Sequence, residues 1–187
     1  MATIYLASSS PRRRALLEAS GMAYRAVEPG IEPVGEGRPD ELARIRARSK
    51  ARGARVEGPP GWVLGVDTVV EIDQRELGQP RDAADARGML SDLSGREHLV
   101  HSAICLLSHP AGELREETAC SRVMFANLSC EDIDVYLASG QWEGKAGAYG
   151  IQDDACGFAR LIEGELDTVI GLPIRVLRRL LGEDVMS

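Results

Sequence analysis

Three serines, a proline and three arginines follow one another from Ser8 to Arg14, directly after an apolar run. A strand that leads into a helix has this pattern, because Ser10 suits the N-cap position and Pro11 the first helical position. The N–H groups of a first helical turn favour negative charge, whereas three cations there repel one another. A bound phosphate would offset that repulsion, and a solvated basic turn is the alternative. We interpret the segment as a phosphate site.

Asp67 is an acidic residue within an otherwise almost entirely apolar run, from Val63 to Val70. Burying an ionised carboxylate is costly unless a cation or a metal ion meets it. A carboxylate in such a place can hold a divalent cation, take a proton from water, or do both. Alternatively, Asp67 sits on a β-bulge, which Gly65 would permit, and accepts backbone N–H groups. We favour the functional interpretation.

Lys50 and Lys145 are the only lysines among the 22 lysine and arginine residues of the chain. A compact ammonium group is not equivalent to a planar guanidinium at a phosphate contact, so we predict that both lysines bind phosphate. Lys145 begins a segment rich in glycine and alanine, in which the backbone can approach a ligand closely. Gln152 ends this segment and offers both a donor and an acceptor to the edge of a base. An ordinary tight loop is the alternative.

Glu32 lies in a loop with the sequence Gly-Ile-Glu-Pro. Taken alone it is a solvated loop acid. Together with Asp67 it would complete a site for a hard divalent cation, since carboxylate oxygens are the ligands that such cations prefer.

The elements that position these residues follow from hydrophobic periodicity and from turn residues. We predict strands over residues 3–8, 24–27, 62–72, 97–107, 114–125 and 158–162, with a short return strand after a turn at 73–75. We predict helices over residues 11–20, 39–56, 131–139 and 173–181, and another that ends at Leu93. Strand–helix pairs followed by a hairpin indicate an α/β fold with a mixed central sheet flanked by helices, in two lobes with a cleft between them. We expect a single domain over residues 1–187, with the two lobes sharing one sheet.

Composition and charge exclude several classes of protein. The net charge of −7 argues against nucleic-acid binding, and no run of 18 apolar residues could cross a membrane. The N-terminus has no signal-peptide pattern, and the four cysteines have no C-x-x-C spacing, so we expect reduced core cysteines in a cytoplasmic protein. The three histidines do not form a zinc pattern, and His98 and His101, three apart in a strand, are expected on opposite faces.

Five ordered motifs together resemble the Maf family, also called septum formation inhibitor proteins, which are nucleoside triphosphate pyrophosphatases. The resemblance extends from Leu6 to Leu181. It is carried by residues 7–13 with 16–17, 47–51, 65–70, 145–152 and 171–173. It implies an elongated mixed sheet, hydrolysis of a nucleoside triphosphate to the monophosphate and pyrophosphate, a divalent metal cation (Mg²⁺ or Mn²⁺), a cytoplasmic location and frequent homodimers.

The resemblance also implies a role for each matching residue. Thr68 after Asp67, together with Gln152, is similar to the branch that acts on dTTP and UTP. Asp67 matches the family's proton acceptor. For the divalent cation, the chemistry of the carboxylates indicates Glu32 and Asp67 as the metal ligands. The positions that set base choice are matched by Arg12, Thr68 and Gln152. The implied phosphate-binding residues are Ser8, Arg13, Lys50 and Lys145.

Several positions depart from the family pattern. Gln79 stands where the family usually has lysine, Gly144 where aspartate is common, and Thr168 where asparagine is common. Asp153 and Asp154 follow Gln152, where glycine is usual. These departures leave two alternatives open: the same chemistry on modified or methylated nucleotides, and a nucleotide-binding regulator of cell division with little turnover.

Overall fold

Seven strands form one mixed sheet in the computed structural model, which describes residues 3–182. The spatial order is β2-β1-β3-β5-β6-β7, and β4 pairs with β3 beside this path. Strand β1 is parallel to both β2 and β3, and all the other strand pairs are antiparallel. The strands are β1 Thr3–Ala7, β2 Tyr24–Val27, β3 Gly61–Ile72, β4 Arg75–Leu77, β5 Glu97–His109, β6 Leu114–Phe125 and β7 Ala159–Glu163.

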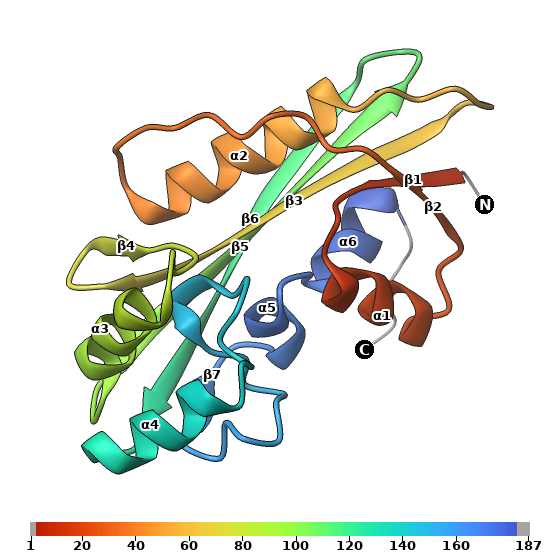
Figure 1. Cartoon of the computed structure of the whole chain (residues 1–187). Coiled ribbons are helices and arrows are strands. Elements are labelled where there is room, and N and C mark those ends of the chain that lie inside the picture. Colours follow the sequence, from red (N-terminus) through yellow and green to blue (C-terminus); the bar gives the residue numbers. More distant parts are fainter. Residues whose placement is uncertain (1–2, 183–187) are drawn as a thin grey trace.

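Within residues 3–182, six α-helices and one 3₁₀ turn accompany the sheet (Figure 1). Helix α2 lies along one side of the long strands, α1 and α6 lie near β1, α5 lies beside α1 toward the middle, and α3 and α4 lie at the other end. The helices are α1 Pro11–Ala19, α2 Pro39–Gly53, α3 Ala83–Leu93, α4 Cys130–Ala138, α5 Leu166–Ile170 and α6 Ile174–Leu181, and the 3₁₀ turn η1 is Ala146–Ala148.

Alternation along the strands divides the core between these helices, because successive side chains in a strand point to opposite faces. Tyr5 and Val63 pack in a cluster with the alanines of α2. Leu6 and Leu64, one position further along, pack instead with residues of α1 and α6. A third cluster joins the far end of β3 to α3 and α4. The predicted α/β fold with a mixed sheet flanked by helices is therefore confirmed.

One edge of β3 is open in its middle. Strand β1 pairs with β3 up to Gly65, and β4 pairs with it from Val70 onward. Between these points, residues 66–69 pair only with β5 among the described strands. Asp67 and Thr68 point to opposite faces of the sheet, yet both lie at this opening. The two neighbouring residues can therefore serve one site from both sides.

Gly65 does not form a bulge, because β3 keeps a regular register with both β1 and β5 through this point. Gly65 allows α2 to pack closely against β3. A Cβ at Gly65 would lie 2.1 Å from the backbone oxygen of Ala47 and 2.8 Å from the backbone nitrogen of Ala51. The bulge alternative for Asp67 is wrong, and the close packing of α2 is what brings Lys50 to the opening.

Most predicted elements are present with small shifts at their ends. Helix α2 ends at Gly53, three residues earlier than expected, and α5 and η1 were not predicted. Ser10 occupies the N-cap of α1, but its side chain makes no capping hydrogen bond, whereas Ser129 and Asp132 form a complete capping box on α4.

All four cysteines are free, but Cys120 and Cys130 are exposed, so the expectation of four core cysteines is wrong for these two. Across residues 3–182, no helix has the length and apolar character needed to cross a bilayer. The single domain over residues 1–187 with two lobes stays a prediction.

Candidate active site

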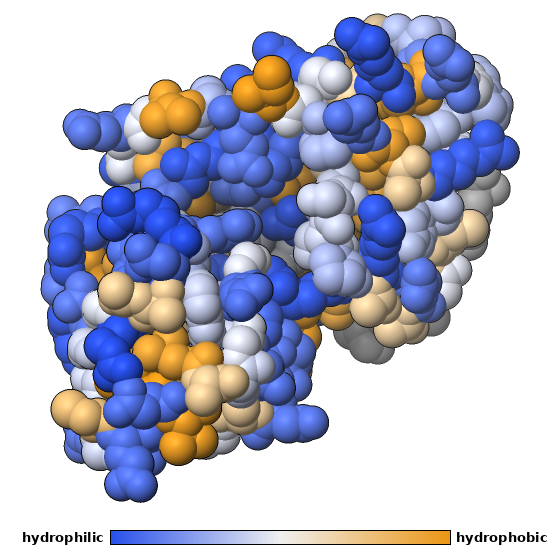
Figure 2. Space-filling view, in the orientation of Figure 1, coloured by the Kyte–Doolittle hydropathy of each residue, from blue (hydrophilic) through white to orange (hydrophobic). Residues whose placement is uncertain are grey.

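A cavity of about 740 Å³ opens at the unpaired stretch of β3. Its walls come from the β1–α1 turn, α2, β3, the segment from 143 to 152, and the end of α5. In Figure 2 the molecule is hollowed between α2 and the side that carries α3 and α4, and hydrophilic residues gather around the hollow. The cavity is lined by all nine residues singled out from the sequence: Ser8, Arg12, Arg13, Glu32, Lys50, Asp67, Thr68, Lys145 and Gln152.

Lys50 lies between two carboxylates on one wall of the cavity. Its Nζ is 2.7 Å from Oδ1 of Asp67 and 2.7 Å from Oε1 of Glu32, and it donates to the backbone oxygen of Val66 at 3.2 Å. The side chains of Lys50 and Asp67 are each 8% exposed, whereas that of Glu32 is 50% exposed. This wall therefore joins a buried ion pair to a carboxylate that solvent can reach.

The environment of Asp67 makes it a stronger base than an ordinary aspartate. Burial raises its pKa, and the nearby charges of Lys50 and Arg13 lower the pKa only in part. Oδ2 of Asp67 is buried and has no hydrogen-bond partner among the described residues. Buried polar atoms are normally paired. A carboxylate oxygen left free in this way is available to a water molecule or a metal ion.

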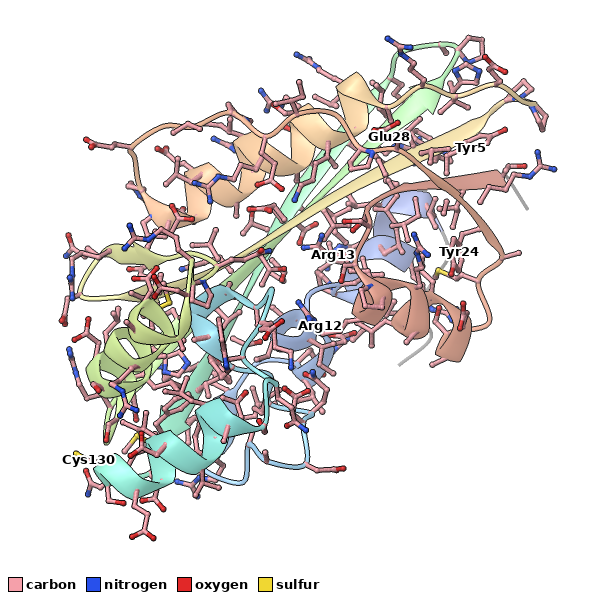
Figure 3. All side chains as sticks on the ribbon, in the orientation of Figure 1. Tyr5, Arg12, Arg13, Tyr24, Glu28 and Cys130 are labelled. Carbon is pink, nitrogen blue, oxygen red and sulfur yellow. The ribbon has the colours of Figure 1, made fainter. Side chains whose placement is uncertain are left out.

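Arg13 ties the β1–α1 turn to β3 and to α5. Its Nε donates to the backbone oxygen of Gly171 at 2.9 Å, Nη1 to Oγ of Ser8 at 3.1 Å, and Nη2 to Oγ1 of Thr68 at 3.2 Å. Thr68 in turn lies 2.8 Å from Oγ of Ser102. Arg13 as a whole is 9% exposed, so these bonds hold the residues around it in fixed positions. Figure 3 shows Arg12 and Arg13 on the side of α1 that faces the middle of the molecule.

The opposite wall carries Lys145, Gln152 and Arg12. Lys145 forms an ion pair with Asp153 and also donates to the backbone oxygen of Gln141. Nε2 of Gln152 donates to Oδ1 of Asp153 at 2.8 Å. Arg12 donates from Nη2 to the backbone oxygen of Gly144 at 3.1 Å. Polar groups on this wall are thus linked through Asp153, which was noted in the sequence only as an unusual acid.

Three charged residues of the cavity were not predicted, namely Arg46, Glu76 and Glu143. Arg46 of α2 forms an ion pair with Glu76 of β4, with Nη2 3.0 Å from Oε2, and both line the cavity. Arg48, two residues later on the same helix, pairs with Glu116 instead. Arg46 lies four residues before Lys50, so the two share one face of α2, and this spacing could have indicated Arg46.

The charges that line the cavity nearly cancel. Five are cationic and four are acidic: Arg12, Arg13, Arg46, Lys50 and Lys145, against Glu32, Asp67, Glu76 and Glu143. A polyphosphate carries several negative charges, so further positive charge would be needed beside it. Within the described part of the chain, no group of three or more His, Cys, Asp or Glu residues is arranged as a metal site.

Asp67 and Glu32 nevertheless suit a single hard cation. Both offer carboxylate oxygens, and Oδ2 of Asp67 has no other partner among the described residues. Magnesium is commonly held by one or two carboxylates, with substrate phosphates and water as the remaining ligands. The residues present therefore fit a divalent cation that binds together with a phosphate ligand.

The chain is similar over most of its length to known proteins. The family model described as Maf-like protein matches residues 3–184. A dTTP/UTP pyrophosphatase of Thermus thermophilus is 43% identical over 171 residues, which cover 91% of this chain and 89% of the relative. A protein of the same name from Agrobacterium fabrum is 40% identical, over 91% of this chain and 86% of the relative. Another from Pelotomaculum thermopropionicum is 37% identical, over 97% of this chain and 96% of the relative.

Proposed function

The chain belongs to the Maf-like protein family, and we propose that it hydrolyses dTTP and UTP to the monophosphate and pyrophosphate. Its relatives from three bacteria are named dTTP/UTP pyrophosphatases. The observation that carries the proposal is a single cavity that joins a buried, partly unpaired carboxylate to cationic and hydroxyl groups. Its volume of about 740 Å³ lies within the usual range for small-molecule sites.

Asp67 is the proton acceptor in this proposal. Its free Oδ2 orients a water molecule and accepts its proton as the water oxygen attacks the α-phosphorus. The bond between the α-phosphorus and the bridging oxygen breaks, and pyrophosphate leaves. Lys50 holds Asp67 through Oδ1 and keeps an ammonium charge beside the reacting phosphate, where it stabilises the negative charge that builds up.

The phosphate groups are held by Ser8, Arg13, Lys50 and Lys145. Arg13 and Ser8 are already bonded to each other, so this part of the site is organised before a ligand arrives. Glu32 and Asp67 would hold Mg²⁺ or Mn²⁺, which neutralises phosphate charge and polarises the phosphoryl oxygens when bound. The nearly balanced charges of the cavity support such a cation.

Base choice is assigned to Arg12, Thr68 and Gln152. Arg12 and Gln152 lie on the wall opposite Lys50, and Thr68 is held by Arg13 at the opening of β3. The proposal includes a cytoplasmic protein whose partner is the nucleotide substrate, and a homodimer as its assembly. It includes no membrane or nucleic-acid partner.

Pyrophosphate release from a nucleotide panel tests the proposal. The panel is dTTP, UTP, dCTP, CTP, ATP and 7-methyl-GTP, each with Mg²⁺, with Mn²⁺ and with EDTA. We expect pyrophosphate from dTTP and UTP with either metal and none with EDTA. Release only from the methylated nucleotide would overturn the base assignment. Nucleotide binding without release under any condition would overturn the enzyme assignment in favour of a regulator.

A further inference from the structure

Asp153 joins two functional side chains of the cavity although it does not line the cavity itself. Its Oδ2 is paired with the ammonium group of Lys145, and its Oδ1 accepts from Nε2 of Gln152 at 2.8 Å. The side chain of Asp153 is 13% exposed and that of Lys145 is 11% exposed, so solvent weakens this ion pair little. Both oxygens of one carboxylate are thus engaged, one by each neighbour.

The backbone holds this arrangement in place. The N–H of Asp153 donates to the backbone oxygen of Gly150 at 2.9 Å, which closes a turn with Gln152 near its end. A Cβ at Gly150 would lie 2.4 Å from Oδ2 of Asp153 and 2.7 Å from Nε2 of Gln152. The carboxylate and the amide are therefore packed directly over Gly150, and the N–H of Gly150 is itself bonded to the hydroxyl of Tyr136.

The chemistry of the carboxylate decides which way the Gln152 amide faces. An ionised carboxylate only accepts hydrogen bonds, so the NH₂ end of the amide must turn toward Asp153. The carbonyl end, Oε1, is then free to accept from a ligand. Uracil and thymine carry an N–H donor at N3, whereas cytosine carries an acceptor at N3 and an amino donor beside it. A fixed Oε1 acceptor favours the first pair of bases at this position.

We infer that Asp153 is a specificity-determining positioning residue, which fixes the Gln152 amide so that the site selects uracil and thymine nucleotides over cytosine nucleotides. The inference rests on the proposed function, because it takes Gln152 as a residue that contacts the base. Asp153 acts through Gln152 and does not touch the reacting phosphate. Its effect should therefore fall on the choice between bases and leave the chemical step nearly unchanged.

Asp153→Asn is the central test. Asparagine can present either an acceptor or a donor to Gln152, so both amide orientations become possible. We expect the ratio of kcat/KM for UTP to that for CTP to fall by about tenfold or more, the scale of one well-placed base contact. We expect kcat for UTP to change by less than about threefold. The matched control is Asp154→Asn, which removes an equal charge from the exposed neighbouring residue and should leave the ratio unchanged.

Two further variants show whether Asp153 acts through Gln152. In a Gln152→Leu background, Asp153→Asn should no longer alter the UTP to CTP ratio, because no amide remains to be oriented. Lys145→Met removes the other partner of Asp153 and should raise KM for both nucleotides equally, without changing the ratio. A ratio that falls as much in the Gln152→Leu background as in the wild type would overturn the inference.

Failure of the inference and failure of the proposed function give different results. A wild-type protein that releases pyrophosphate from neither UTP nor CTP overturns both. A wild-type protein that prefers UTP, with the same preference in Asp153→Asn, overturns only the role of Asp153. Thermal unfolding accompanies each assay, and Asp153→Ser serves as a second uncharged variant. Loss of folding in both variants would make Asp153 a stability residue and overturn the inference.

Discussion

The two lysines of the chain stand on opposite walls of one cavity, and each is paired with an aspartate. Lys50 and Lys145 are similarly buried, with side chains 8% and 11% exposed. The difference lies in the second oxygen of each aspartate. Oδ2 of Asp67 has no hydrogen-bond partner among the described residues, whereas the second oxygen of Asp153 is engaged by Gln152. A carboxylate with one free oxygen is available for chemistry, and one with both oxygens engaged is suited to positioning.

The largest effect is expected on the Lys50 wall, from Asp67→Asn. Asparagine keeps the size of the side chain and removes its basicity, so we expect kcat for dTTP to fall by about 10²- to 10⁴-fold, the usual contribution of a general base. Binding of a non-hydrolysable dTTP analogue should persist. Steady-state kinetics and calorimetric titration measure the two quantities. A variant that keeps a tenth or more of the wild-type kcat would contradict the assignment of Asp67.

Lys50→Met is the next largest change. It removes a charge-assisted hydrogen bond to Asp67 and a cation from the phosphate site, and we expect kcat/KM for dTTP to fall by about 10- to 100-fold. Arg48→Gln is the matched control, because Arg48 lies on the same helix but is paired with Glu116. It should change kcat/KM by less than twofold. Equal losses in the two variants would show that charge on α2, and not the position of Lys50, matters.

Lys145→Met tests the contribution of the opposite wall to phosphate binding. Lys145 is paired with Asp153, which does not line the cavity, whereas Lys50 is paired with Asp67, the proposed base, so the loss of Lys145 should cost less than the loss of Lys50. We expect KM for dTTP and UTP to rise by about tenfold or less, with kcat nearly unchanged. Initial-rate measurements over a range of substrate concentrations separate the two constants. A loss confined to kcat would place Lys145 at the reacting phosphate and remove the contrast between the walls.

The smallest effect concerns stability on the Lys145 side. Tyr149 lines the cavity, and its hydroxyl lies 2.8 Å from Nε2 of His98. Burial lowers the pKa of His98 from 6.5 to about 4. The unfolded chain therefore takes up the proton first, so the stability that His98 gives in its neutral form is complete above pH 6.5 and is lost as the pH falls toward 4.

Removal of His98 should flatten this dependence. In the wild type, His98 contributes a decrease in the free energy of unfolding of at most about 1.4 kcal/mol per pH unit below its unfolded pKa. Urea unfolding of His98→Gln between pH 7.5 and 5 should show a shallower decrease than the wild type. Parallel curves for the two proteins would show that the titration of His98 does not govern acid stability.

The sequence was sufficient to predict much of the fold and part of the lining of the cavity, and local patterns explain why. Long apolar strands and helix caps such as Ser129 are local features, and the nine residues singled out from the sequence are among those that line the cavity. Helix α5 was missed because five residues are too few for a helical period to be visible. The wrong expectation for Cys120 and Cys130 has a similar cause, since composition does not indicate which residues are exposed.

Features that depend on distant contacts could not be predicted. Helical spacing places Arg46 on the face of Lys50, but the pairing of Arg46 with Glu76 depends on β4, which the packing of α2 over Gly65 brings near. The link between Asp153 and Lys145 depends on the turn at Gly150, which brings two residues eight positions apart into contact. The sequence showed an unusual acid at 153 but not its partners.

At the open edge of β3, main-chain groups take part in the cavity, and an alanine scan of the protein does not remove them. Alternate residues of a strand direct their backbone groups to the same side, and the carbonyl of Val66 already meets Lys50 there. The main-chain N–H and C=O groups of Thr68, which lines the cavity, therefore face the same open edge. Substituting side chains leaves these groups in place, so an alanine scan will underestimate the affinity of this wall. Replacing the amide of residue 68 with an ester would measure how much its main-chain N–H group contributes to ligand affinity.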